Sequence, residues 1–174
     1  QRFVVDDFAI ISGAYEMHVT DLYSGAIRTA TLQDLVDLVK LGHSYGLYGS
    51  APVRPLDLPP LLQELAMYKV SFEYSNRRPG AVLDANPVST PRAAAYALEM
   101  SQVVGHPFSL GLWIVSPFVA TTENLELIES MRGRHLPLWV ATMPVAGTTA
   151  PITMPGAYLQ SVAELLAGLT LIYL

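Results

Sequence analysis

The feature that most constrains this chain is a regular alternation of short apolar runs with helical patterns. The apolar runs are centred near residues 48, 82, 111 and 139, about 34, 29 and 28 residues apart, and each gap holds one helical pattern. Repeated strand–helix units of this kind imply parallel strands joined by right-handed crossovers. Four units make half of an eight-stranded barrel, which needs about 250 residues when complete. The spacing alone fits a small open doubly wound sheet equally well.

The individual elements have recognisable boundaries. Strands are predicted at 46–49, 81–83, 108–115 and 136–143, and helices at about 61–72, 91–105, 122–133 and from 155 onward. A hairpin is predicted before them, with β-prone runs at 17–20 and 26–29. A helix then starts after Thr31, with Asp34 placed to complete a capping box. We therefore expect an N-terminal hairpin and helix extension at 1–45. The first half of a barrel, truncated at its C-terminus, should follow at 46–174.

Composition restricts the class of protein. Hydrophobic residues make up 51% of the chain and charged residues 14%, which excludes disorder. A net charge of -5 argues against a nucleic-acid partner. The absence of cysteine removes disulfides and thiolate sites and fits a reducing compartment, so we expect a cytoplasmic protein. The apolar run 163–174 is too short to cross a membrane and contains Glu164, so it is interpreted as a buried helix.

Most catalytic signatures are absent from the sequence. It contains no Gly-rich phosphate or dinucleotide fingerprint, no nucleophile elbow and no pair of histidines at metal-binding spacing. His106 and His135 each precede a predicted strand, which places them on the structural face of a barrel and not on its catalytic face. No metal site is predicted.

The segment 144–156 is the strongest candidate for a site, because it directly follows the fourth predicted strand and leads into the last helix. Glycine lets backbone approach a ligand, hydroxyls give adaptable hydrogen bonds, and a helix N-terminus attracts negative charge. A rigid loop that closes the rim of the barrel is the alternative. The candidate binding residues of this segment are Gly147, Thr148, Thr149 and Thr153.

Other strand exits add further candidates. Ser116 follows the third strand, and Asp84 follows the second, where its carboxylate could attract a cation or simply cap a turn. Trp113 and Trp139 lie on predicted strands; core packing is the default for them, although aromatic faces also bind quaternary ammonium groups. Glu164, like Glu99, interrupts an apolar helical face and is interpreted as a surface residue or a satisfied internal partner.

Several motifs resemble the trimethylamine methyltransferase family. The loop 143–153 with Gly156, followed by Ala163–Gly168, is similar to that family's "GATxPxTxxG" loop and "AExLAG" helix. Val115-Ser116-Pro117 matches its "SP" strand exit, and 25–31 with Asp34 matches its N-terminal "G..R.AT..D" segment. The sequence departs mildly from the pattern at Thr148, where alanine is common, and at Met154-Pro155.

The resemblance implies an N-terminal part of a (β/α)8 barrel that is longer than this chain and homo-oligomeric when complete. It implies transfer of a methyl group from a tertiary or quaternary amine, such as trimethylamine or glycine betaine, to the cobalt of a separate corrinoid protein. The corrinoid would be carried by that partner. Archaeal members, whose reaction serves methanogenesis, carry pyrrolysine at a position beyond Leu174. Two rival hypotheses remain: a non-catalytic barrel that binds betaine-like ligands, and a barrel enzyme of another reaction class.

Overall fold

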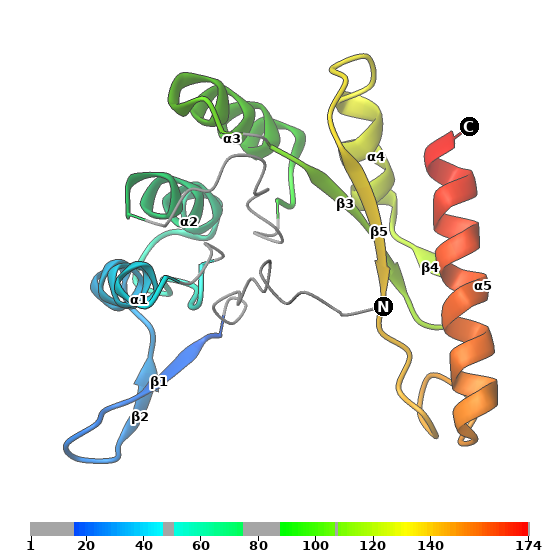
Figure 1. Cartoon of the computed structure of the whole chain (residues 1–174), viewed down its shortest axis with the longest axis horizontal. Coiled ribbons are helices and arrows are strands. Elements are labelled where there is room, and N and C mark those ends of the chain that lie inside the picture. Colours follow the sequence, from blue (N-terminus) through cyan, green and yellow to red (C-terminus); the bar gives the residue numbers. More distant parts are fainter. Residues whose placement is uncertain (1–15, 47–50, 75–87, 107, 174) are drawn as a thin grey trace, which may run out of the picture. The chain divides into compact units, whose positions relative to one another are not determined.

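The computed structural model describes residues 16–46, 51–74, 88–106 and 108–173. The chain divides into two compact units, one formed by Gln1–Pro87 with Ala95–Phe108 and the other by Val88–Ala94 with Ser109–Leu174. The predicted division into a hairpin and helix extension at 1–45 and half of a barrel at 46–174 stays a prediction. Figure 1 shows the elements in chain order.

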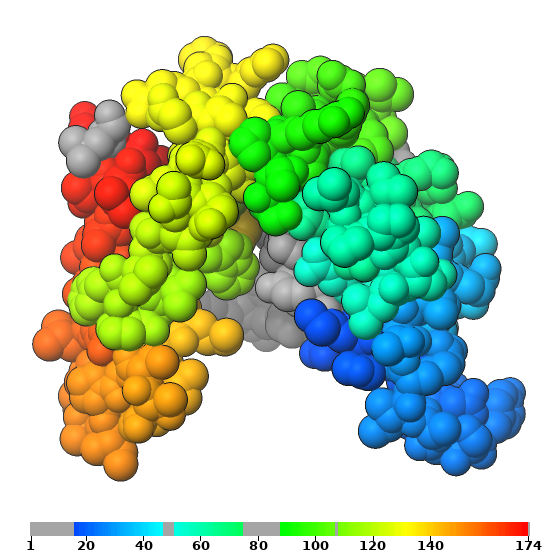
Figure 2. All heavy atoms as spheres, turned by 180° about the vertical axis from the view of Figure 1, so that it is seen from behind, coloured from blue at the N-terminus to red at the C-terminus, as the bar shows by residue number. Residues whose placement is uncertain are grey.

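The first unit begins with the predicted hairpin. Strands β1 (His18–Thr20) and β2 (Ile27–Thr29) pair antiparallel, and the Asp21 carboxylate accepts hydrogen bonds from the backbone of the turn between them. The hairpin projects beyond the helices of its own unit (Figures 1 and 2), and Leu22 and Tyr23 at its tip are exposed. The predicted hairpin is confirmed.

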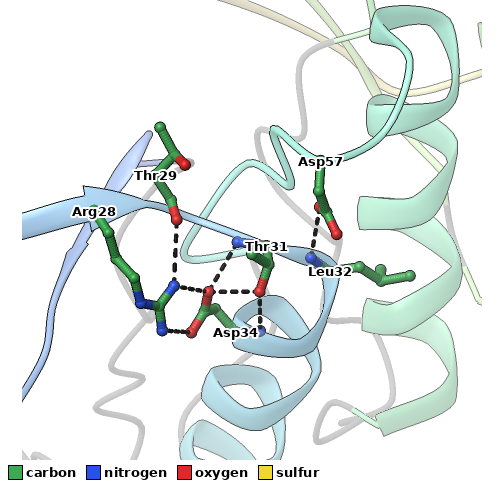
Figure 3. A network of polar contacts seen from close by, with 6 residues as sticks. All are labelled: Arg28, Thr29, Thr31, Leu32, Asp34 and Asp57. Carbon is green, nitrogen blue, oxygen red and sulfur yellow. Dashed lines mark hydrogen bonds and ion pairs between the residues drawn. The ribbon is translucent and has the colours of Figure 1, made fainter.

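Helix α1 (Leu32–Ser44) begins with the predicted capping box. The N–H of Asp34 donates to Thr31 Oγ1 at 3.3 Å, and the Asp34 carboxylate accepts from the Thr31 N–H at 2.8 Å. Arg28 on β2 binds the same carboxylate through two nitrogens, at 2.6 and 2.7 Å (Figure 3). The Arg28 guanidinium holds the pKa of Asp34 well below its usual range, and the Thr31 donors act in the same direction against the effect of burial. The N-terminal motif therefore joins the hairpin to the helix.

The core of this unit forms where α1 packs on α2 (Pro60–Tyr74). Leu35 and Val39 of α1 meet Met67 and Val70 of α2, because apolar positions three and four residues apart share one face of each helix. Tyr68 and Phe72 extend the core toward the segment after α3 (Pro91–Val104), where their rings contact those of Phe108 and His106, respectively. The buried position of His106 agrees with a structural role for this residue.

The second unit contains a three-stranded sheet in the order β4-β3-β5. Strands β3 (Leu110–Val115) and β5 (Leu138–Thr142) are parallel, with Leu110 opposite Leu138 and Ile114 opposite Thr142. Helix α4 (Thr122–Ser130), capped by Thr121, connects them, so one predicted strand–helix–strand unit is confirmed. The two-residue strand β4 (Val119–Ala120) pairs antiparallel with the end of β3 and was not predicted.

Helix α5 (Met154–Tyr173) packs on both parallel strands at Gly168. A Cβ atom at this position would lie 2.4 Å from Val140 Cγ1 and 3.2 Å from Ile114 Cγ1, so only glycine lets the helix approach the sheet so closely. The prediction that 163–174 is a buried helix is wrong. Only Glu164 and Gly168 of α5 are buried, and in the described part of the chain no element covers its apolar residues on the far side, such as Leu166 and Tyr173.

The structure confirms a mixed α/β fold with five helices within the described ranges, and it leaves the barrel a prediction. The sheet of the second unit does not close on itself. The strands predicted at 46–49 and 81–83 lie outside the described residues, apart from Gly46, which forms a turn. Among the described helices none is both long and apolar enough to cross a membrane.

Candidate functional site

The carboxyl ends of β3 and β5 lie side by side and carry hydroxyl groups. Ser116 directly follows β3, and Thr142 is the last residue of β5. Their oxygens are 3.1 Å apart. Because the carboxyl ends of parallel strands meet at one edge of a sheet, this edge is where sites of α/β proteins form. We refer to it as the β3–β5 edge.

A buried carboxylate lies beneath this edge. Glu164 of α5 is completely inaccessible to solvent. Its Oε2 accepts hydrogen bonds from Ser116 Oγ, at 2.7 Å, and from Thr142 Oγ1. Its Oε1 accepts from the backbone N–H of Phe118 at 3.2 Å and from Gln160 Nε2 at 2.8 Å. Four donors from three parts of the chain therefore satisfy one carboxylate.

The balance of these effects keeps Glu164 ionised. Burial by itself raises the pKa of a carboxyl group, because it disfavours the charged form. The hydrogen bonds from Thr142, Ser116, Gln160 and the Phe118 N–H outweigh burial, so the pKa of Glu164 lies below its ordinary value. The edge therefore contains a fixed negative charge at neutral pH.

The segment after β5 folds into a tight loop at this edge. The carbonyl of Val145 accepts hydrogen bonds from the N–H groups of Thr148, Thr149 and Ala150, at 3.0 to 3.1 Å. In return, the N–H of Val145 donates to Thr149 Oγ1 at 2.8 Å. Gly147 has a φ of +81°, a left-handed conformation that favours glycine over residues with a side chain. We call residues 145–150 the β5 loop.

Gln160 connects the β5 loop to the buried carboxylate. Its Nε2 donates to the backbone carbonyl of Thr149 at 2.7 Å as well as to Glu164. At the start of α5, a Cβ on Gly156 would lie 2.8 Å from both Pro151 Cβ and Thr153 Oγ1. Residues 151–153, between the β5 loop and α5, are thus closely packed on the first turn of that helix.

The structure brings most of the predicted site residues to this one edge. Ser116 joins the carboxylate network, Gly147 to Thr149 lie in the β5 loop, and Thr153 lies where α5 begins. Thr149 is half-buried, whereas Thr148 and Thr153 are exposed. Asp84 lies outside the described residues. Whether any of these residues binds substrate stays a prediction.

Sequence reasoning did not identify Thr142 and Gln160 as part of this edge, and it interpreted Glu164 as either a surface residue or a satisfied internal partner. The structure supports the second alternative, since Glu164 is buried and has four donors within the chain. Two signals in the sequence favour an internal role for Glu164, although they do not show which strand ends donate to it. Gln160 and Glu164 are four residues apart on one helical face, and Glu164 interrupts an otherwise apolar run.

The two tryptophans lie in the strands themselves and contact each other. The rings of Trp113 and Trp139 meet edge to face, with centroids 5.3 Å apart. The Trp139 ring also occupies the space beside Gly111, where a Cβ would lie 2.3 Å from it. These contacts agree with the packing role that is the default for strand tryptophans. Among the described residues no group of three or more His, Asp or Glu side chains could hold a metal ion.

The fold and the edge together define an α/β protein whose candidate site lies at the carboxyl ends of parallel strands. The chain belongs to the trimethylamine methyltransferase family: residues 6–174 match the family described as Trimethylamine methyltransferase (MTTB). Membership implies a methyltransferase enzyme that acts on a small methylated amine. A comparison with curated proteins found no significant match.

Proposed function

We propose that this chain is part of an enzyme that moves a methyl group from a tertiary or quaternary amine to the cobalt of a separate corrinoid protein. The match of residues 6–174 to the methyltransferase family carries the proposal. We further propose that the β3–β5 edge contributes to the substrate site, through Ser116 and the hydroxyl-bearing residues 148, 149 and 153. The enzyme is expected to act in the cytoplasm as a homo-oligomer.

The chemistry of the reaction fits a site without an acid–base pair. A cobalt(I) nucleophile, supplied by the partner, takes the methyl carbon, and the electron pair of the broken C–N bond stays on nitrogen. A quaternary ammonium therefore leaves as a neutral amine and needs no general acid. A tertiary amine must react as its protonated ammonium form, which likewise leaves as a neutral amine. Because a cation and an electron-rich nucleophile are consumed together, a site that excludes water favours the step. The task of this chain is then to position the amine and to keep water out.

The exposed apolar side chains around the edge support binding of the corrinoid that the partner protein carries. Several apolar side chains around the β5 loop are exposed, namely those of Met143, Val145, Ile152 and Met154. Exposed apolar residues close together are typical of surfaces that bind another molecule. They could cover the apolar parts of a macrocycle that the corrinoid protein presents, and they would exclude water from the edge when it docks.

The proposal is tested with the full-length enzyme, a reduced corrinoid protein, and a panel of amines that includes trimethylamine and glycine betaine. Methyl transfer changes the visible absorbance of the corrinoid. Thr153→Val should lower the transfer rate about tenfold if its hydroxyl binds a charged group of the substrate. Thr170→Val, on the exposed side of α5, is the matched control and should leave the rate unchanged.

Two results would contradict the proposal. An unchanged corrinoid spectrum with every amine would overturn the assigned reaction. Tight calorimetric binding of a methylated amine without transfer to any corrinoid protein would instead favour the non-catalytic binder.

A further inference from the structure

The Glu164 carboxylate joins segments that are far apart in the sequence. Ser116 and Phe118 follow β3, Thr142 ends β5, and Gln160 lies one helical turn before Glu164 on α5. A charge buried in an apolar helix is strongly destabilising unless its hydrogen bonds are all made. Because this carboxylate has its full set of donors, each donor segment is held in one place relative to the others.

The first segment held in this way is the turn after β3. Phe118 has a φ of +55°, a left-handed conformation that is unfavourable for a residue other than glycine. Its N–H donates to Glu164 Oε1, while the residue as a whole is 56% exposed. Residues held in rare backbone conformations by their surroundings occur mostly at functional sites. The contact with Glu164 thus fixes an exposed aromatic residue beside the carboxyl end of β3.

The second segment is the β5 loop, which Gln160 reaches. A primary amide nitrogen carries two hydrogens, and the structure gives each an acceptor: Glu164 Oε1 and the carbonyl of Thr149. Thr149 Oγ1 is already occupied as the acceptor for the Val145 N–H. A hydroxyl has one donor as well, so the proton of Thr149 can point toward a ligand.

We propose that Glu164 and Gln160 are positioning residues that fix the Phe118 turn and the β5 loop at the β3–β5 edge. This inference rests on the proposed function for its consequence in catalysis. Glu164 has no solvent-accessible surface, so it acts on the substrate through the groups it holds and not by contact. Gln160 extends the fixed geometry to Thr149 through the hydrogen bond to its carbonyl. Loss of either side chain therefore makes the Phe118 turn or the β5 loop more mobile.

The nature of the donors allows positioning to be separated from charge. In Glu164→Gln the amide oxygen can keep the Phe118 N–H and Gln160 donors. The new NH2 group then faces Ser116 and Thr142, whose hydroxyls can turn and accept. This variant removes the charge but keeps the geometry. Glu164→Leu removes both. Gln160→Ala breaks the connection to the β5 loop and also removes one of the four donors to Glu164, while the donors from Ser116, Thr142 and Phe118 remain.

The test uses two measurements on the full-length enzyme: methyl transfer to the corrinoid protein, and hydrogen exchange of the Thr148–Ala150 and Phe118 amides. Gln160→Ala should speed hydrogen exchange in the β5 loop. It should also lower kcat/KM about tenfold, the effect expected if the Thr149 hydroxyl loses one hydrogen bond to a charged group of the substrate. Glu164→Leu should do the same at both segments, while Glu164→Gln should stay within about threefold of the wild type. Gln33→Ala is the matched control, because Gln33 donates to Asp37 four residues on along an exposed face of α1.

Each outcome decides the matter. Unchanged exchange in Gln160→Ala overturns the positioning role, and so does faster exchange with normal transfer in an active enzyme. Loss of transfer in Glu164→Gln with unchanged exchange shows that charge is what matters. If the wild type transfers no methyl group but exchange responds as described, the proposed function fails while the positioning of the two segments stands.

Discussion

The close packing of α5 on the sheet can be tested by adding one methyl group at Gly168. Alanine is favoured over glycine inside a helix by about 1 kcal/mol. Against this, the new Cβ would lie 2.4 Å from Val140 Cγ1 and 3.2 Å from Ile114 Cγ1, and overpacking of this kind costs about 1–3 kcal/mol. We therefore expect Gly168→Ala to lower the free energy of unfolding by up to about 2 kcal/mol.

Removing the obstructing atoms should reverse the sign. Val140→Ala deletes the Cγ1 atom that the new methyl group meets, so Gly168→Ala made in that background should be neutral or stabilising by up to about 1 kcal/mol. Urea unfolding of the full-length enzyme measures all four proteins of the cycle. Ala167→Gly, at the exposed neighbouring position, reports the helix-propensity difference on its own. Equal destabilisation by Gly168→Ala in both backgrounds would refute the packing argument.

Three further changes test the edge and the N-terminal motif. Thr149→Val should lower methyl transfer about tenfold while Thr149→Ser keeps it, whereas a lower melting temperature with normal transfer by the folded molecules would show that the hydroxyl only braces the loop. Gly147→Ala forces a side chain into a left-handed conformation and should lower stability by about 1 kcal/mol, as a melting curve would show. The folded-state pKa of Asp34 lies below its ordinary value of 3.8, so its stabilising contribution is present above that pH and is lost as the pH falls further. Asp34→Asn should therefore be less stable than the wild type at neutral pH and less sensitive to acid in unfolding experiments between about pH 4 and 2.

The local elements were predictable because their signals lie within a few residues. Thr31 and Asp34 are spaced for a capping box, and the structure contains the reciprocal bonds. The parallel pairing of β3 with β5 follows from two apolar runs separated by one helix. The β4 strand was not predicted because it has only two residues, and their pairing depends on the turn at Phe118. The left-handed backbone of this turn could not be predicted, since no glycine stands at that position.

The candidate edge was predicted in part for a similar reason. The loop after β5 could be located from its glycine and threonine residues and its place in the chain. The buried carboxylate could not, because its donors lie 22 to 48 residues before it, apart from Gln160. The burial of α5 was overestimated, since an apolar helix pattern does not say how many neighbours the helix has.

The motifs that relate this chain to its family have physical roles in the structure that differ from one motif to the next. Arg28 and Asp34 join the hairpin to α1 by one ion pair that contains two hydrogen bonds, and this contact serves folding. In the "AExLAG" helix, Gly168 sets the distance between α5 and the sheet, while Glu164, one turn earlier, binds the ends of both parallel strands. Since the glycine brings the helix close enough for the carboxylate to reach Ser116 and Thr142, the two residues depend on each other. A substitution at Gly168 should therefore also disturb the β3–β5 edge. In this way the helix motif would affect the site without touching a ligand, because it sets how closely Glu164 approaches the strand ends.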